Sequence, residues 1–297
     1  MGDDGAVLAS NLVLFAAAER ALRALAARGV RVAPIKGAWL VERGLRDARE
    51  RSMCDVDLVV DWEKRPAAHA AMLATGFARL HERPNRPYTD RVSCEWSYEL
   101  RLGGGEVHLE LHFAIAPVGW LRVTTRELLD RAVAGSFGGV PCLQLADEDN
   151  VCIVLYHLGH HGFTAGREAY IDLVKLRRAG LLDDIRSVLE RCRRWGCGTI
   201  AWTALDVMNV AFPEVAVELP VEFRPSLASR VYLGHALRRG AFPACAVRAE
   251  SLYGRFVHRW FLMDGADQRV CLLTDVPYRV AHDVVELGGG RSATNSP

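Results

Sequence analysis

The sequence lacks an excess of charge of either sign. It has 37 Lys and Arg residues against 36 Asp and Glu residues, which gives a formal net charge of +1 over 297 residues. Proteins that bind long nucleic acids or membrane surfaces through electrostatics usually carry a clear basic excess. The near balance therefore argues against long nucleic acid and against a membrane as partners.

Long hydrophobic runs and paired cysteines are also missing. The longest apolar run near the start, Leu12–Ala18, is shorter than the roughly 20 residues that span a bilayer, and acidic residues precede it. The eight cysteines are scattered without a CxxC pair, which argues against a disulfide framework or a zinc knuckle. We therefore expect a soluble, cytoplasmic protein with reduced cysteines.

The periodicity of the apolar residues predicts an α+β fold in two parts. Residues 1–118 alternate short helices with strands and predict a mixed-sheet domain. Residues 119–287 are mainly helical, with a helix over 122–135 and a small hairpin near 136–145, around two glycines. The Gly/Ser-rich residues 288–297 predict a disordered tail.

Two aspartates interrupt the apolar stretch CDVDLVV, which covers residues 54–60. Because side chains alternate faces along a strand, Asp55 and Asp57 share one face and the apolar residues take the other. Two neighbouring carboxylates repel each other, and a divalent cation such as Mg²⁺ relieves the repulsion. The stretch therefore predicts a metal-binding face.

A second strand, EVHLELHFAI, also has one polar face, which carries Glu106, His108, Glu110 and His112. If it lies beside the first strand, Glu110 supplies a third carboxylate, and we prefer it to Glu106, which adjoins a glycine turn. Three such carboxylates hold two Mg²⁺ ions in a phosphoryl or nucleotidyl transfer site. His112 is a candidate for nucleotide contact and could also be a metal ligand, a base or a partner of Glu110, and a structural role is the alternative.

The step APIKGAWL predicts a phosphate site where a strand ends and a helix begins. Gly37 allows close approach of a ligand, and Lys36 adds a positive charge. Arg51 is four residues before Asp55 and is a further candidate for contact with a triphosphate, with Arg46 as a weaker one.

These motifs together resemble the nucleotidyltransferase superfamily built on the polymerase-β-type palm. The fuller pattern, PIKGAWL, RSMCDVDLVV, HLELHF, LADED, LYHLGHHGF and DLVKL, is similar to a bacterial branch of uncharacterised nucleotidyltransferases with a helical C-terminal half. The resemblance implies metal ligation by Asp55, Asp57 and Glu110 and phosphate binding at Lys36 and Gly37. Most of the superfamily has Gly-Gly or Gly-Ser at that step, so the lysine is a departure.

The expected activity is Mg²⁺-dependent transfer of a nucleoside monophosphate from a nucleoside triphosphate to an acceptor hydroxyl or phosphate, with release of pyrophosphate. One alternative is a binding module without catalysis. Another is a metal phosphohydrolase that uses His157, His160, His161 and Asp172, because the helical spacing places the three histidines near one face. If the chain is a nucleotidyltransferase, His161 and Asp172 are candidates for contact with the nucleotide. The remaining interpretation is that the histidines and Asp172 form a polar contact between two helices.

Overall fold

The computed structural model describes residues 4–80, 94–102, 105–163, 166–238 and 252–289. Its first part is a mixed five-stranded sheet in the order β1-β2-β5-β4-β3, and β2 and β5 pair in parallel while the other neighbours pair antiparallel. The strands are β1 (Val32–Pro34), β2 (Asp55–Val60), β3 (Ala78–Arg79), β4 (Glu95–Leu102) and β5 (Gly105–His112). An α+β fold with an N-terminal mixed sheet is therefore confirmed.

The helices of the first part are α1 (Asp4–Ala27), α2 (Lys36–Glu42), the short η1 (Trp62–Lys64), α3 (Arg65–Ala74) and α5 (Thr125–Arg131). Helices α1 and α3 cover the apolar face of the sheet, whereas Leu128 and Leu129 of α5 lie in a second core with Val59, which is on the face of Asp57. Val56 and Leu58 of β2 join Leu109 of β5 in a core with α1 and α3. Because these positions alternate with Asp55 and Asp57, the carboxylates face the opposite side of the sheet.

Helix α1 is longer than the apolar run in the sequence indicates. It has 24 residues and, by length and composition alone, is apolar enough to cross a membrane. In the structure Leu14, Ala18, Leu22 and Leu25 are buried against the sheet. This packing accounts for the apolar residues of α1 as those of a core helix.

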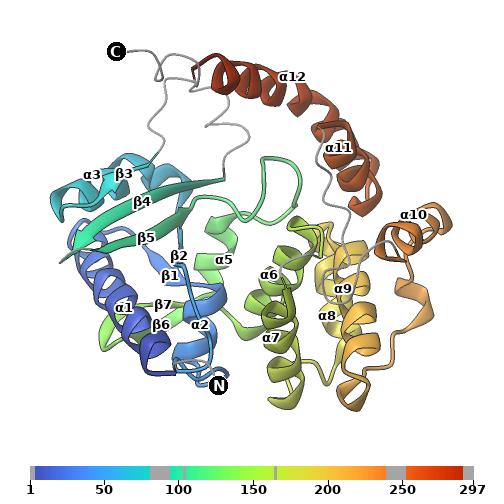
Figure 1. The fold of residues 1–297 in the computed structure, drawn as a ribbon, viewed down its shortest axis with the longest axis horizontal. Helices are drawn as coiled ribbons and strands as arrows, with labels where there is room; N and C mark the ends of the chain where they lie inside the picture. The colour runs from blue at the N-terminus through green and yellow to red at the C-terminus, as the bar shows by residue number, and fades with distance from the viewer. Residues whose placement is uncertain (1–3, 81–93, 103–104, 164–165, 239–251, 290–297) are drawn as a thin grey trace, which may run out of the picture.

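A helical part follows the sheet. It contains α6 (Asp147–His160), α7 (Gly166–Arg178), α8 (Ile185–Trp195), α9 (Gly198–Ala211), η2 (Pro213–Val215), η3 (Val221–Phe223), α10 (Leu227–Arg238), α11 (Leu252–Leu262) and α12 (Ala266–Gly289). Figure 1 shows α6 to α9 side by side, next to the sheet. Ile35 and Val59 of the sheet region share one core with Leu155 of α6, so apolar packing joins the two parts.

The hairpin begins earlier in the chain than expected, and it packs against the first part of the protein. Strands β6 (Val133–Phe137) and β7 (Val140–Gln144) pair antiparallel, so the helix expected over 122–135 is wrong beyond Arg131. Phe137 and Val140 are buried in the core of the sheet part, and the Phe137 ring meets that of Phe15 in α1 edge to face. The hairpin therefore packs with the first part, although its sequence position precedes the helical part.

The predicted ends of the two parts have different outcomes. The boundary at residue 118 stays a prediction. Helix α12 continues to Gly289, so a disordered tail from residue 288 is wrong for its first two residues. The rest of that expected tail, 290–297, lies outside the described residues.

Candidate functional site

The parallel pairing of β2 with β5 brings the predicted carboxylates together. Asp57 is the Cα partner of Glu110, and Asp55 is the partner of His108. Asp55, Asp57, Glu110 and His112 all project from the polar face of these two strands, as their alternation requires. Their placement side by side depends on a register that joins two segments far apart in the chain.

Asp57 stands at the centre of the cluster. Lys36 Nζ donates to Asp57 Oδ1 at 2.7 Å, and His112 Nε2 lies 2.7 Å from the same oxygen. Burial alone would raise the pKa of Asp57, but the charges and hydrogen bonds of Lys36 and His112 outweigh it and hold the pKa below its ordinary value. Asp57 is therefore a carboxylate with two cationic partners.

His112 is buried and protonated in this arrangement. Burial and the Lys36 charge act to lower its pKa, but hydrogen bonds to Asp57, Cys94 and Glu110 raise it well above the ordinary value. The Lys36 pKa is raised as well, because the attraction of Asp57 outweighs burial. Lys36 and His112 thus supply the positive charge that balances the carboxylates.

The flanking carboxylates differ in environment. Burial, followed by repulsion from Asp57 and Glu110, raises the pKa of Asp55 to about 6. The pKa of Glu110 is lowered, first by its hydrogen bond to His112, and Ser97 Oγ donates to Glu110 at 3.3 Å. Among the described residues none donates a hydrogen bond to the Asp55 carboxylate. The negative charges of Asp57 and Glu110 repel it, and no hydrogen bond offsets that repulsion.

These residues fit a divalent cation. Oxygen and nitrogen atoms of Asp57, Glu110 and His112 lie within 4.8 Å of one another, and the repelled Asp55 stands next to them in β2. Carboxylate oxygens are the donors that Mg²⁺ prefers, and a cation would relieve the repulsion that raises the Asp55 pKa. The donor set is thus suited to a hard metal ion.

The Lys36–Gly37 step has an uncommon backbone. Lys36 has φ +52°, in the left-handed region that residues with a Cβ rarely adopt. A Cβ at Gly37 would collide with the Arg51 guanidinium and the sulfur of Met53. Glycine is therefore required for Arg51 to lie against the start of α2. Because α2 has only seven residues, we assign the attraction for anions to Lys36 and Arg51 rather than to a helix dipole.

Arg51 is held in place by Asp172 of α7. Arg51 Nη2 donates to Asp172 Oδ2 at 3.0 Å, and Arg46 Nη1 donates to Asp172 Oδ1 at 2.8 Å. Arg46 also donates to Glu168 at 2.8 Å. The Asp172 carboxylate, a predicted contact of the nucleotide, is thus occupied by two guanidinium groups and links the loop before β2 to the helical part.

One cavity of about 460 Å³ collects the predicted site residues, with the exception of the weaker candidate Arg46. Its lining includes Lys36, Gly37, Arg51, Asp55, Asp57, Glu110, His112, His161 and Asp172. Cavities of 300–1,000 Å³ are typical of small-molecule sites. The sheet supplies the carboxylates and the helices α6 and α7 supply the opposite wall, so the cavity lies between the two parts of the chain.

The histidines of α6 line the same cavity but do not form a metal site with Asp172. Burial lowers the pKa of His157 well below its ordinary value and lowers that of His161. Within the described ranges, the groups that bring three ligand atoms together are Asp57–Glu110–His112 and a set around Cys94. The geometry therefore does not favour the phosphohydrolase that was considered from the His157, His160, His161 and Asp172 spacing.

Four residues at or beside the site were missed by the sequence reasoning, namely Cys94, Glu95, Ser97 and Glu168. The sequence predicts a glycine turn at 103–105, and in the register of β4 with β5 Leu102 pairs with Gly105 and Glu95 pairs with His112. Counting back from that turn would have identified Glu95. No local signal identifies Glu168, because its place depends on how α7 packs.

The fold and the carboxylate-lined cavity define a nucleotidyltransferase-type protein. The family described as "Uncharacterised nucleotidyltransferase" matches residues 5–213, which is more than half of the chain, and the chain belongs to that family. The match crosses the predicted boundary at residue 118, so sheet and helical parts are both included. The resemblance inferred from the motifs is confirmed.

One solved structure is similar to this chain, the solution structure of the antibiotic-resistance factor ANT(2'')-Ia. The sequence identity is 14% and the TM-score is 0.39, and the likeness covers 68% of this chain and 92% of that chain. No curated protein matches the chain.

Proposed function

We propose that this chain is a Mg²⁺-dependent nucleotidyltransferase with a two-ion site. It transfers a nucleoside monophosphate from a nucleoside triphosphate to an acceptor hydroxyl or phosphate and releases pyrophosphate. The observation that carries the proposal is the grouping of Asp55, Asp57 and Glu110 in one cavity with Lys36 and Arg51. Membership of a nucleotidyltransferase family supports the class of reaction.

The three carboxylates would hold the metal ions. Bound Mg²⁺ supplies positive charge to the attacking and leaving oxygens of the transfer. Asp57 and Glu110 are adjacent across β2 and β5, and Asp55 lies on the same face. With its pKa of about 6 in the metal-free site, Asp55 is largely ionised at neutral pH.

The basic residues would bind the triphosphate. Lys36 Nζ lies beside Asp57, one of the carboxylates that would hold the ions, and its ammonium group is compact enough to meet one phosphate oxygen. The planar guanidinium of Arg51 offers two parallel donors, although Asp172 uses part of this capacity. Asp172 is therefore a positioning residue, which fixes the direction of Arg51 across the cavity.

A label-transfer assay tests this proposal, with the release of pyrophosphate measured in parallel. Each nucleoside triphosphate, labelled at the α-phosphate, is incubated with the protein, Mg²⁺ and a cell extract, and the labelled product is identified. Asp57→Ala should reduce transfer to background, and a chelator should do the same to the wild type. Glu106→Gln is a control at a carboxylate outside the cluster, since Glu106 is on β5, the strand of Glu110, but its side chain is 49% exposed beside Arg101.

Two results would overturn the proposal. Full Mg²⁺-dependent transfer by Asp57→Ala would remove the carboxylate site from the mechanism. Binding of the triphosphate in calorimetry without release of pyrophosphate, over all extracts and nucleotides, would leave a nucleotide-binding module in place of a transferase.

A further inference from the structure

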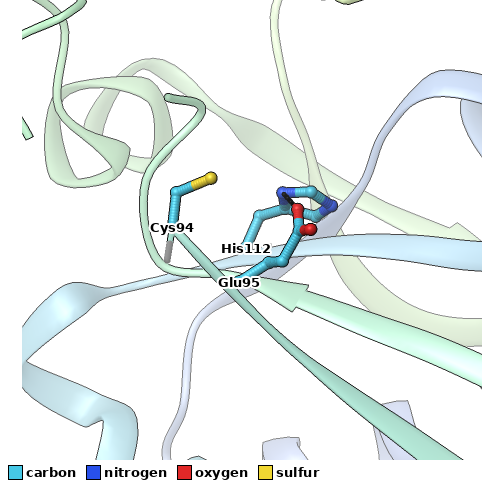
Figure 2. Close-up of side chains that lie close together, drawn as sticks. All are labelled: Cys94, Glu95 and His112. Atoms are coloured by element: carbon cyan, nitrogen blue, oxygen red, sulfur yellow. Dashed lines mark ion pairs between the residues drawn. The ribbon is translucent and has the colours of Figure 1, made fainter. Parts of the chain in front are cut away.

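A second set of metal-ligand side chains lies next to the carboxylate cluster. Cys94 directly precedes β4, Glu95 is its first residue, and Glu95 is the Cα partner of His112 at the end of β5. The Cys94 sulfur, a Glu95 oxygen and a His112 ring nitrogen lie within 4.8 Å of one another. Figure 2 shows the three side chains projecting to the same side of the two strands.

The backbone fixes Cys94 in this position. Its carbonyl oxygen accepts hydrogen bonds from the N–H groups of Phe113 at 2.8 Å and Ala114 at 3.1 Å. The backbone of Cys94 is therefore held beside the end of β5 by main-chain contacts that do not depend on a ligand. Ligand positions that are held before binding reduce the conformational entropy that binding removes.

The two ring nitrogens of His112 face different groups. Nε2 lies 2.7 Å from Asp57 Oδ1, whereas Nδ1 lies 3.3 Å from Glu95 Oε2. Metal-binding histidines commonly donate their second ring N–H to a carboxylate, which fixes the tautomer and the ring direction. With Nε2–H donated to Asp57, deprotonation of His112 at Nδ1 directs a lone pair toward Cys94 and Glu95.

We propose that Cys94, Glu95 and His112 Nδ1 form a binding site for a borderline-soft divalent cation, with Zn²⁺ as its natural occupant. A thiolate, an imidazole nitrogen and a carboxylate are all common zinc ligands, whereas Mg²⁺ has little affinity for sulfur. Three protein ligands leave the fourth position of a tetrahedral ion open, and all three residues line the cavity.

The charges balance when the ion binds. The Cys94 thiol and the Nδ1–H of His112 each release one proton, and thiolate plus carboxylate then neutralise the two charges of the ion. His112 keeps the Nε2–H that it shares with Asp57. Occupancy therefore fixes the His112 ring against Asp57 and excludes Nε2 as a ligand for an ion held by Asp57 and Glu110. The site goes beyond nucleotidyl transfer and stands whether or not the chain has that activity.

Metal binding by the purified full chain tests the assignment. The protein is freed of metal with a chelator, and Co²⁺ is titrated as a spectroscopic probe for a sulfur-to-metal charge-transfer band. Zn²⁺ retained after desalting is counted by mass spectrometry. In the wild type we expect one bound equivalent of metal and the sulfur-to-metal band. Cys94→Ser should lose the band and bind Zn²⁺ more than about 100-fold more weakly, since even loss of an outer-shell partner costs 10–100-fold in affinity.

Two variants serve as controls, with folding checked by circular dichroism. Cys54→Ser removes an exposed thiol that lines the same cavity, and it should keep both the band and the stoichiometry. Asp55→Asn weakens the carboxylate cluster and should also leave zinc binding unchanged. The proposal is overturned by the absence of a sulfur band in the wild type, by unchanged binding in folded Cys94→Ser, or by equal loss in Cys54→Ser.

Discussion

Asp172 gives a quantitative test of how the cavity is held together. Arg46 Nη1 lies 2.8 Å from Asp172 Oδ1, and Arg46 Nη2 lies 2.8 Å from Glu168 Oε2. The two contacts have the same length but different surroundings, because the side chain of Asp172 is 6% exposed and that of Glu168 is 63% exposed. One guanidinium thus has a buried partner and an exposed partner that can be removed separately.

We expect Asp172→Asn to lower the free energy of unfolding by about 3–5 kcal/mol, the usual cost of removing one partner from a buried ion pair. Arg46, with a side chain only 2% exposed, would keep its charge with one solvated partner. Burial raises the pKa of Asp172 even against the attraction of Arg51 and Arg46, and this acts in the opposite direction, because the neutral amide escapes the burial penalty of the charge. The loss should therefore fall near the lower end of this range. Glu168→Gln should cost less than about 1 kcal/mol, as a surface pair does.

Urea denaturation at neutral pH, followed by circular dichroism, measures both changes. Equal losses in the two variants, or a loss below about 1 kcal/mol for Asp172→Asn, would refute the reasoning from burial. In the transfer assay, Asp172→Asn should raise the KM for the triphosphate more than it lowers kcat, because it releases Arg51. An unchanged KM would show that Arg51 is oriented without Asp172.

Three further predictions concern separate residues. Lys36→Gly should be more stable than Lys36→Ala by about 1 kcal/mol in denaturation, because the φ of +52° is accessible to glycine without a steric cost, and equal stability would contradict this. Glu110→Gln should lower transfer strongly and Glu106→Gln should not, and the reverse result would reassign the third carboxylate. Burial, and then Arg259, lower the pKa of His258 to about 4, so roughly 3 kcal/mol of stability should be lost as the pH falls from 6.5 to 4. Denaturation of His258→Phe should lack this pH dependence, and an identical profile would show that His258 is not its source.

The faces of the two polar strands were predictable because they are set by alternation within a few residues. Asp55 and Asp57 are opposite the core residues Val56 and Leu58, as the sequence indicates. The helix expected over 122–135 failed beyond Arg131 because residues 133–137 pair with β7, and that pairing overrides the local pattern.

The sequence by itself determined the residue types of the site and the side of each strand on which they lie, since both follow from local order along the chain. Only the tertiary structure decided that Asp57 lies beside Glu110, that Asp172 forms ion pairs with Arg46 and Arg51, and that Glu95 pairs with His112 across β4 and β5. These partners come from strand register and from the packing of α7 against the loop before β2. Such contacts join segments far apart in sequence, and their free energy depends on burial that exists only in the folded chain.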